Sequence, residues 1–154
     1  GAIGFAAAMK IAEKSRNSEA KRLAKLRDEL AEFLREEFGA ALKINSCAKN
    51  KLPNVLNVSL ENLDGERAVF ALDLAGVEVS TGSACAANSG RRSHVLTAIG
   101  LNAEMADGSL RVSLGSATTA EEIARAKPIF AGVLREQLKF GSQSSQNLRG
   151  GKVS

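Results

Sequence analysis

The stretch Leu56-Asn57-Val58-Ser59-Leu60 decides the fold, because apolar and polar residues alternate along it. This period of two predicts a half-buried strand with one apolar face and one polar face. The same alternation recurs at residues 42–45 and 109–114, and a helical segment spans about residues 65–75. We therefore expect an α+β fold, in which helices pack mainly on one face of a small, mostly antiparallel sheet.

A long helix precedes the sheet, from about Ala6 to Phe38, and it contains neither Pro nor Gly. Four leucines between residues 23 and 34 recur in steps of three and four, which places them on one face. Gly39 fits the end of this helix. The first turns are apolar and have no evident partner in a domain of this size. We expect them to pack against a neighbour outside the chain.

Shorter elements complete the pattern. A strand is expected at residues 77–79 and a short helix from Ser93 to Ile99. Capping boxes at residues 118–122 predict a last helix to about Lys139, with a kink or break at Pro128. The tail is mostly Gly, Ser, Gln and Asn, and we expect it to be disordered or loosely docked. The expected division is a linking helix (1–40), a small α+β domain (41–140) and this tail (141–154).

The composition of the 154 residues excludes several classes of protein. Hydrophobic residues make up 44% and charged residues 25%, which are globular values. No stretch of 18 apolar residues is present, so we expect no membrane span. The absence of Trp and Tyr argues against a base-stacking surface for nucleic acid. The net charge of +4 comes from interleaved charges of both signs, which are typical of a solvated surface.

The two cysteines, Cys47 and Cys85, do not make a disulfide framework, so we expect a reducing, cytoplasmic compartment. The apolar start lacks the basic region of a signal peptide. The chain also begins with Gly1 instead of an initiator Met, inside what reads as a helix. We therefore expect it to be a piece of something longer.

Cys85 lies in the most informative stretch, residues 80–90, where all the remaining residues are small or polar. A structural cysteine is usually buried as a small hydrophobe, and this loop offers no evident core for it. The composition alone leaves two readings open, a reactive accessible thiol and an incidental surface cysteine. A thiol that must travel between a substrate and an acceptor would suit such a tether.

Arg111 is the second candidate, in the middle of the strand expected at residues 109–114. It shares a face with Ser109 and Ser113. One reading is a solvated polar face or a salt bridge. The other is a fork that binds a carboxylate through two hydrogen bonds, for which guanidinium geometry is suited.

A series of segments then matches a known family in order: the long charged helix, residues 52–59, 65–75, 80–85, 93–96, 99–101, 111–115 and 118–122. With these landmarks, residues 1–138 resemble the C-terminal small domain of cysteine desulfurases. Those are pyridoxal-phosphate enzymes of the class V aminotransferase family, with a fold-type I small domain. The form Ser-x-Gly-Ser-Ala-Cys at residues 80–85 resembles the long-loop branch, which commonly feeds iron–sulfur cluster assembly.

The resemblance implies that Cys85 is the nucleophile, which takes sulfur from L-cysteine as a persulfide and leaves alanine, and that Arg111 holds the substrate carboxylate. It also implies pyridoxal phosphate in the full-length enzyme. The family's Schiff-base lysine normally follows a histidine, whereas the one histidine here, His94, is followed by Val95. We therefore expect no cofactor-binding residue and no bound cofactor in this chain, which alone should be inactive.

The implied partners are L-cysteine, a sulfur acceptor or iron–sulfur scaffold protein, and a second copy in a homodimer, with neither nucleic acid nor membrane. A non-catalytic sulfur-relay or scaffold-binding module is the alternative. A Cys85–His94 hydrolase dyad lacks an evident orienting group and oxyanion motif. Cys47, Cys85 and His94 match no closed zinc pattern, so we expect no metal. Cys47 reads as an inert residue near the sheet edge.

Overall fold

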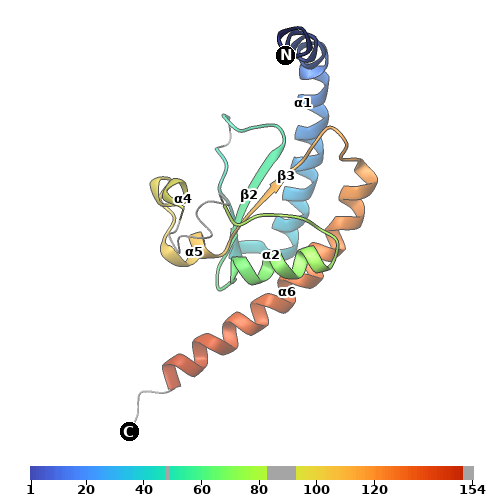
Figure 1. Cartoon of the computed structure of the whole chain (residues 1–154). Coiled ribbons are helices and arrows are strands. Elements are labelled where there is room, and N and C mark those ends of the chain that lie inside the picture. Colours follow the sequence, from blue (N-terminus) through green and yellow to red (C-terminus); the bar gives the residue numbers. More distant parts are fainter. Residues whose placement is uncertain (48, 83–92, 151–154) are drawn as a thin grey trace.

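The computed structural model describes residues 1–47, 49–82 and 93–150, with side chains to residue 141. The elements in chain order are α1 (Ala2–Phe38), η1 (Gly39–Ala41), β1 (Leu42–Ile44), β2 (Val55–Leu60), α2 (Gly65–Leu74), α4 (His94–Ala98), α5 (Ala103–Asp107), β3 (Ser109–Ser113) and α6 (Ala120–Gly150) (Figure 1). The expected α+β class and the long first helix are confirmed. Within these residues no helix has the length and apolar character needed to cross a membrane.

The sheet has three strands in the order β1-β2-β3, and both pairings are antiparallel. Leu60 of β2 lies opposite Leu42 of β1, and Leu56 lies opposite Val112 of β3. These four side chains are buried. Because neighbours in register point to the same face, the alternation seen in the sequence becomes one continuous apolar face across three strands. The three strands predicted from period two are confirmed.

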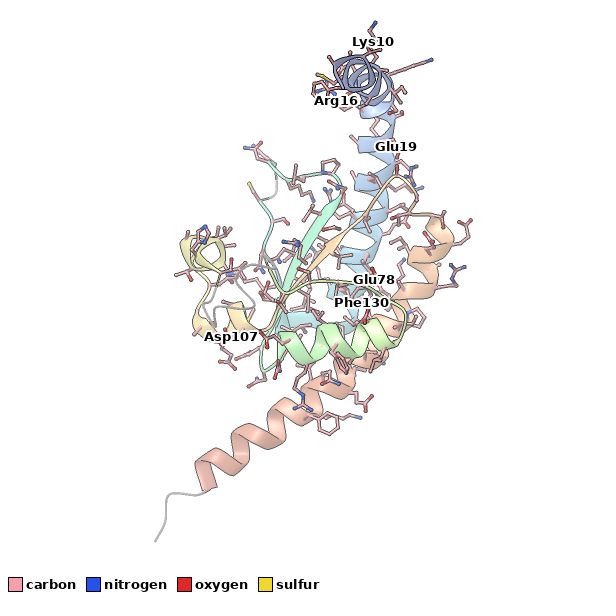
Figure 2. The ribbon with its side chains drawn as sticks, viewed as in Figure 1. Lys10, Arg16, Glu19, Glu78, Asp107 and Phe130 are labelled. Atoms are coloured by element: carbon pink, nitrogen blue, oxygen red, sulfur yellow. The ribbon has the colours of Figure 1, made fainter. Side chains whose placement is uncertain are left out.

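Helices α1, α2 and α6 cover this apolar face, with α6 packed against both α1 and α2 (Figure 1). Phe130 of α6 is almost completely buried in the core between them (Figure 2). The four leucines predicted to share a face of α1 are all buried. The largest fully buried side chains are Leu30, Leu34, Val58, Leu60, Leu72, Leu110, Phe130 and Leu134. The hydrophobic core therefore lies between one sheet face and three helices.

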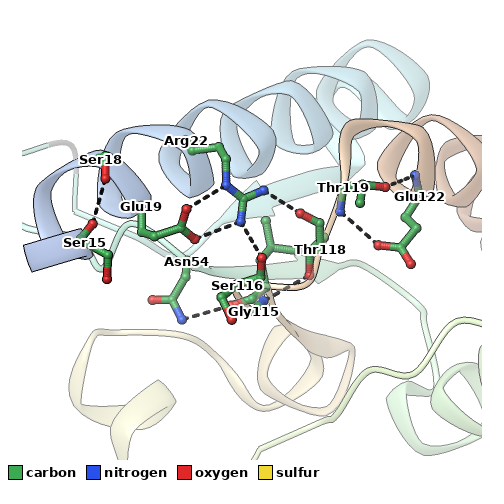
Figure 3. Close-up of polar contacts among 11 residues, drawn as sticks. Ser15, Ser18, Glu19, Arg22, Asn54, Gly115, Ser116, Thr118, Thr119 and Glu122 are labelled. Carbon is green, nitrogen blue, oxygen red and sulfur yellow. Dashed lines mark hydrogen bonds and ion pairs between the residues drawn. The ribbon is translucent and has the colours of Figure 1, made fainter. Parts of the chain in front are cut away.

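Side-chain caps set the starts of two of these helices. The Asp64 carboxylate accepts a hydrogen bond from the Arg67 backbone N–H at 3.1 Å, which begins α2. At the start of α6, Thr119 and Glu122 form a reciprocal capping box (Figure 3). The Glu122 N–H donates to the Thr119 hydroxyl (3.2 Å), and the Thr119 N–H donates to the Glu122 carboxylate (2.9 Å). This capping box was predicted from the sequence and is confirmed.

Arg22 joins α1 to the loop between β3 and α6 (Figure 3). Its guanidinium donates to the backbone carbonyl of Ser116 at 2.9 Å and to that of Thr118 at 2.5 Å. Glu19, one turn earlier, accepts from Nε at 3.1 Å and from Nη2, which also reaches Ser116, at 2.9 Å; this hydrogen bonding lowers the pKa of the Glu19 carboxyl. The contact fixes the exit of β3 relative to the long helix.

Arg27, a buried arginine, holds the segment that leads into β2. Its guanidinium donates to the Leu52 carbonyl at 2.5 Å and to the Asp28 carboxylate at 2.9 Å. Partial burial would raise the pKa of Asp28, but hydrogen bonds from Arg27 and Lys51 outweigh it and hold that pKa below its usual value. The guanidinium thus satisfies a backbone carbonyl and a carboxylate at once.

Two expectations are corrected. Residues 77–79 do not form a strand, because the Val77 N–H is taken by the Leu72 carbonyl at the end of α2, and only Ser80 reaches β3, in an isolated bridge with Arg111. The last helix does not end near Lys139, because α6 runs on to Gly150, and Pro128 lies inside it without ending it. The division of the chain with a disordered or loosely docked tail at residues 141–154 stays a prediction. A Cβ at Gly141 would lie 2.1 Å from the Asn62 carbonyl, so this glycine permits close packing of α6 against Asn62.

The apolar start of α1 extends beyond the sheet (Figures 1 and 2). Ile3, Phe5, Met9 and Ile11 are largely exposed, with Ile3 at 89%. The described part of the chain provides no cover for these side chains. The expectation that a surface outside the chain covers them stays a prediction.

Truncation of a leucine in the core should destabilise the fold far more than the same truncation on its surface. We expect Leu34→Ala to lower the free energy of unfolding by about 2–5 kcal/mol, because Leu34 is 0% exposed and its removal leaves a cavity. Leu74→Ala is the matched control, since Leu74 is also helical but 74% exposed, and it should change stability by less than about 0.5 kcal/mol. Urea denaturation measures both. Equal losses would contradict the described core.

Candidate functional site

The face of the sheet opposite the core carries polar side chains, which we call the polar face. It includes Asn45, Asn57, Ser59, Ser80, Ser109 and Arg111. Asn57 and Arg111 are register partners in β2 and β3, and Ser80 pairs with Arg111 on its other side. Sequence positions 57, 80 and 111 are thereby brought into one row across the molecule.

A hydrogen-bonded network fills the interior of the polar face. The Asn57 amide donates to the Ser109 hydroxyl and to the Leu110 carbonyl, both at 3.1 Å. The Asn45 amide donates to the Asn57 side-chain carbonyl and to the Ser59 hydroxyl, both at 2.7 Å. Ser59 and Ser109 are fully buried, so these bonds satisfy groups that water cannot reach. The network fixes β2 and β3 behind Arg111.

The Asn45 side-chain carbonyl is the exception in this network. Its Oδ1 atom is buried and has no hydrogen-bond partner among the described residues. The amide nitrogen of the same side chain is fully used, so turning the amide over would only exchange one unsatisfied group for another. The network therefore leaves one acceptor unsatisfied at its edge near Asn45, whereas the hydrogen-bonding groups of Asn57 and Ser109 have partners.

Arg111 lies in the middle of β3, where the sequence placed it, and is half-buried. Its Nη2 donates to the Ser80 hydroxyl at 3.1 Å. No acidic side chain among the described residues pairs with it, so the salt-bridge reading finds no support there. A guanidinium that is half-buried and bound to one neutral hydroxyl retains donors for a carboxylate.

Ser80 connects Arg111 to the segment that leads to Cys85. Its backbone N–H donates to the Arg111 carbonyl at 3.1 Å, and its own carbonyl accepts the Arg111 N–H at 2.6 Å. Its hydroxyl also donates to the Gly82 carbonyl at 2.8 Å and accepts the Gly82 N–H at 3.2 Å. Arg111, the candidate carboxylate-binding residue, is thus bonded to the first residue of the stretch 80–90, which contains the candidate nucleophile Cys85.

Of the other candidate residues, His94 and Cys47 do not lie in the row formed by residues 57, 80 and 111. Cys85 lies outside the described residues, so the structure places neither its thiol nor the Cys85–His94 dyad. His94 is exposed at the first residue of α4, and Cys47 is exposed beyond β1. Among the described residues no group of three His, Cys, Asp or Glu side chains could hold a metal ion.

Sequence reasoning did not assign a role to Ser80 or Asn57. The signal for Asn57 was present, because the alternation in β2 already placed it on the face opposite the leucines. Its opposition to Arg111 depends on the register between β2 and β3, which residue types alone do not fix. The Ser80–Arg111 contact joins residues 31 positions apart and follows from no local pattern.

Comparison with known proteins gives concordant results for family and fold. The model of the family described as Aminotransferase class-V matches residues 1–126. The chain is 41% identical over 123 residues to a cysteine desulfurase IscS of Dictyoglomus turgidum, covering 80% of this chain and 31% of that protein. It is 38% identical over 132 residues to the cysteine desulfurase IscS 1 of Archaeoglobus fulgidus, covering 86% and 34%.

Solved structures agree with this assignment. A structure titled NifS-like protein superposes with a TM-score of 0.73 at 30% identity, covering 88% of this chain and 33% of that one. A NifS-like protein from Rickettsia africae gives a TM-score of 0.72 at 26% identity, covering 84% and 33%. The chain spans about a third of the length of the curated relatives it matches. It belongs to the class V aminotransferase family, and the two relatives named above are cysteine desulfurases.

Proposed function

We propose that this chain is the C-terminal small domain of a cysteine desulfurase, in which Cys85 receives sulfur from L-cysteine and Arg111 binds the substrate carboxylate. The observation that carries the proposal is the pairing of Arg111 with Ser80. It places a half-buried guanidinium beside the residue that stands five positions before Cys85. The family membership and the cysteine desulfurase relatives support the same reaction.

Arg111 suits a carboxylate for two reasons. Its backbone is fixed in β3 between Ser80 and Asn57, so the guanidinium extends from a rigid base. A planar guanidinium can also donate two parallel hydrogen bonds to the two oxygens of one carboxylate, and such charge-assisted bonds are stronger than neutral ones. Arg111 would hold the carboxylate end of L-cysteine and leave its sulfur free to meet a thiol.

Cys85 would act on that sulfur as a thiolate, which is the nucleophilic form of a cysteine side chain. An S–S bond forms between Cys85 and the substrate sulfur as the substrate C–S bond breaks. The electron pair of the C–S bond stays on carbon, which takes up a proton and leaves as alanine. Cys85 is left as a persulfide, from which a second thiol can take the terminal sulfur.

Pyridoxal phosphate does not fit the residues of this chain. The only histidine, His94, is followed by Val95 and lies exposed on α4, so the chain lacks the histidine–lysine pair that carries the Schiff base in the family. We place the cofactor site in the two thirds of the relatives' length that this chain does not span. The remaining roles belong to the same proposal: transfer to a sulfur acceptor or iron–sulfur scaffold protein, a homodimer of the whole enzyme, and a cytoplasmic location.

Substitution of the two cysteines tests which thiol is functional. In an intact desulfurase that contains this chain, Cys85→Ser should abolish sulfide release from L-cysteine, because a hydroxyl cannot form a persulfide. Cys47→Ser is the matched control and should retain most of the activity. Sulfide production with a reducing thiol as acceptor measures both. Near-wild-type turnover in Cys85→Ser would refute the assignment of the nucleophile.

Arg111→Ala tests the carboxylate contact separately from the thiol. It should raise the KM for L-cysteine by roughly ten- to a hundredfold, because it removes a charge-assisted contact worth about 1.5–3 kcal/mol. Arg125→Ala, at an exposed position on α6, is the control for loss of one positive charge and should leave KM unchanged. Steady-state kinetics over a range of L-cysteine concentrations separates KM from kcat. An unchanged KM in Arg111→Ala would contradict the proposed role.

A further inference from the structure

We infer that Ser80 is a positioning residue for Arg111, because its hydroxyl holds one edge of the guanidinium and thereby presents the remaining donors to the substrate carboxylate. The inference rests on the proposed carboxylate-binding role of Arg111 and adds a residue to that site. It is supported by the backbone pairing of the two residues, by the use of every hydrogen-bonding site on the Ser80 hydroxyl, and by the commitments of the other polar side chains nearby.

The backbone places the two side chains together. Ser80 and Arg111 exchange both of their backbone hydrogen bonds, at 3.1 and 2.6 Å, as a directly opposed antiparallel pair. Residues opposed in this way project their side chains to the same face of the sheet. The hydrogen bond from Arg111 Nη2 to the Ser80 hydroxyl, at 3.1 Å, is therefore built on two backbone bonds.

The Ser80 hydroxyl has no freedom left to turn away. A serine hydroxyl offers one donor and two acceptor lone pairs. Its donor goes to the Gly82 carbonyl at 2.8 Å, and its acceptors take the Gly82 N–H at 3.2 Å and Arg111 Nη2. The two bonds to Gly82 hold the oxygen independently of the arginine, so it is a fixed acceptor for Arg111 Nη2.

The other side chains of the polar face are committed elsewhere. Asn57 lies opposite Arg111 on β2, but its amide bonds Ser109 and Leu110, and its carbonyl accepts from Asn45 and Ser109. Among the described residues, the only side chain that hydrogen-bonds the Arg111 guanidinium is Ser80. A long, flexible side chain with a single anchor loses its preferred orientation when that anchor is removed.

The first experiment uses the 154-residue chain and needs no activity. NMR of the Arg111 side chain measures the rate of rotation about its Cζ–Nε bond, and the backbone spectrum of each variant verifies that it folds. Ser80→Ala should speed this rotation roughly two- to tenfold, because one guanidinium hydrogen bond is lost. Ser80→Thr retains the hydroxyl and should restore the wild-type rate. Ser113→Ala, a hydroxyl removed from the same face of β3, should have no effect.

The second experiment measures kinetics in the intact desulfurase with the same variants. Ser80→Ala should raise the KM for L-cysteine about three- to tenfold, in proportion to the loss of one hydrogen bond, with a smaller effect on kcat. Ser80→Thr should recover the KM, which a general disturbance of the fold would not predict. Ser113→Ala should match the wild type.

The outcomes separate this inference from the proposed function. A raised KM in Arg111→Ala together with an unchanged KM or an unchanged rotation rate in Ser80→Ala overturns the role of Ser80 and retains that of Arg111. Failure of Ser80→Thr to restore either quantity also overturns it, since the hydroxyl would not be the cause. An unchanged KM in Arg111→Ala removes the carboxylate site, and the inference with it.

Discussion

The pairing of β2 with β1 on one side and β3 on the other is the constraint on which the rest of the structure depends. Both pairings are antiparallel, and their register aligns the apolar residues of all three strands on one face. A sheet with a continuous apolar face cannot remain open to water, and α1, α2 and α6 bury it. The free energy gained by this burial is also what orders the polar face behind it, because the same backbone carries both faces.

Close contacts at the end of the sheet make that pairing specific. The Leu60 N–H of β2 donates to the Gly108 carbonyl at 3.1 Å, just before β3 begins. A Cβ at Gly108 would lie 2.2 Å from the Leu60 carbonyl, so a larger residue could not occupy this position without displacing the backbone. The glycine thus brings α5 and β3 against β2 and fixes where the β2–β3 ladder ends.

The polar face turns this scaffold into a candidate site. Its interior, around Asn57 and Ser109, is saturated with hydrogen bonds and serves as a rigid support. Its outer edge holds Arg111 and Ser80, where the described residues leave donors of a charged group for a ligand. Rigid support behind a group with unused donors is the arrangement that a binding site requires. In the proposed desulfurase, this edge would hold one end of the substrate while the thiol of Cys85 acts on the other.

The sequence by itself determined most of the elements, because these depend on local periodicity or capping, but it did not predict α5. Period two identified the three strands, the leucine repeat identified the buried face of α1, and Thr119 with Glu122 identified the start of α6. A series of segments in order, among them residues 80–85 and 111–115, suggested the family by resemblance. Local reasoning misjudged the ends of two helices. Residues 77–79 were expected to form a strand, but the Leu72 carbonyl at the end of α2 takes the Val77 N–H. The last helix was expected to end near Lys139, but α6 continues to Gly150. Only the tertiary structure placed Ser80 beside Arg111, because that contact depends on strand register and chain path and not on the residues that flank either one.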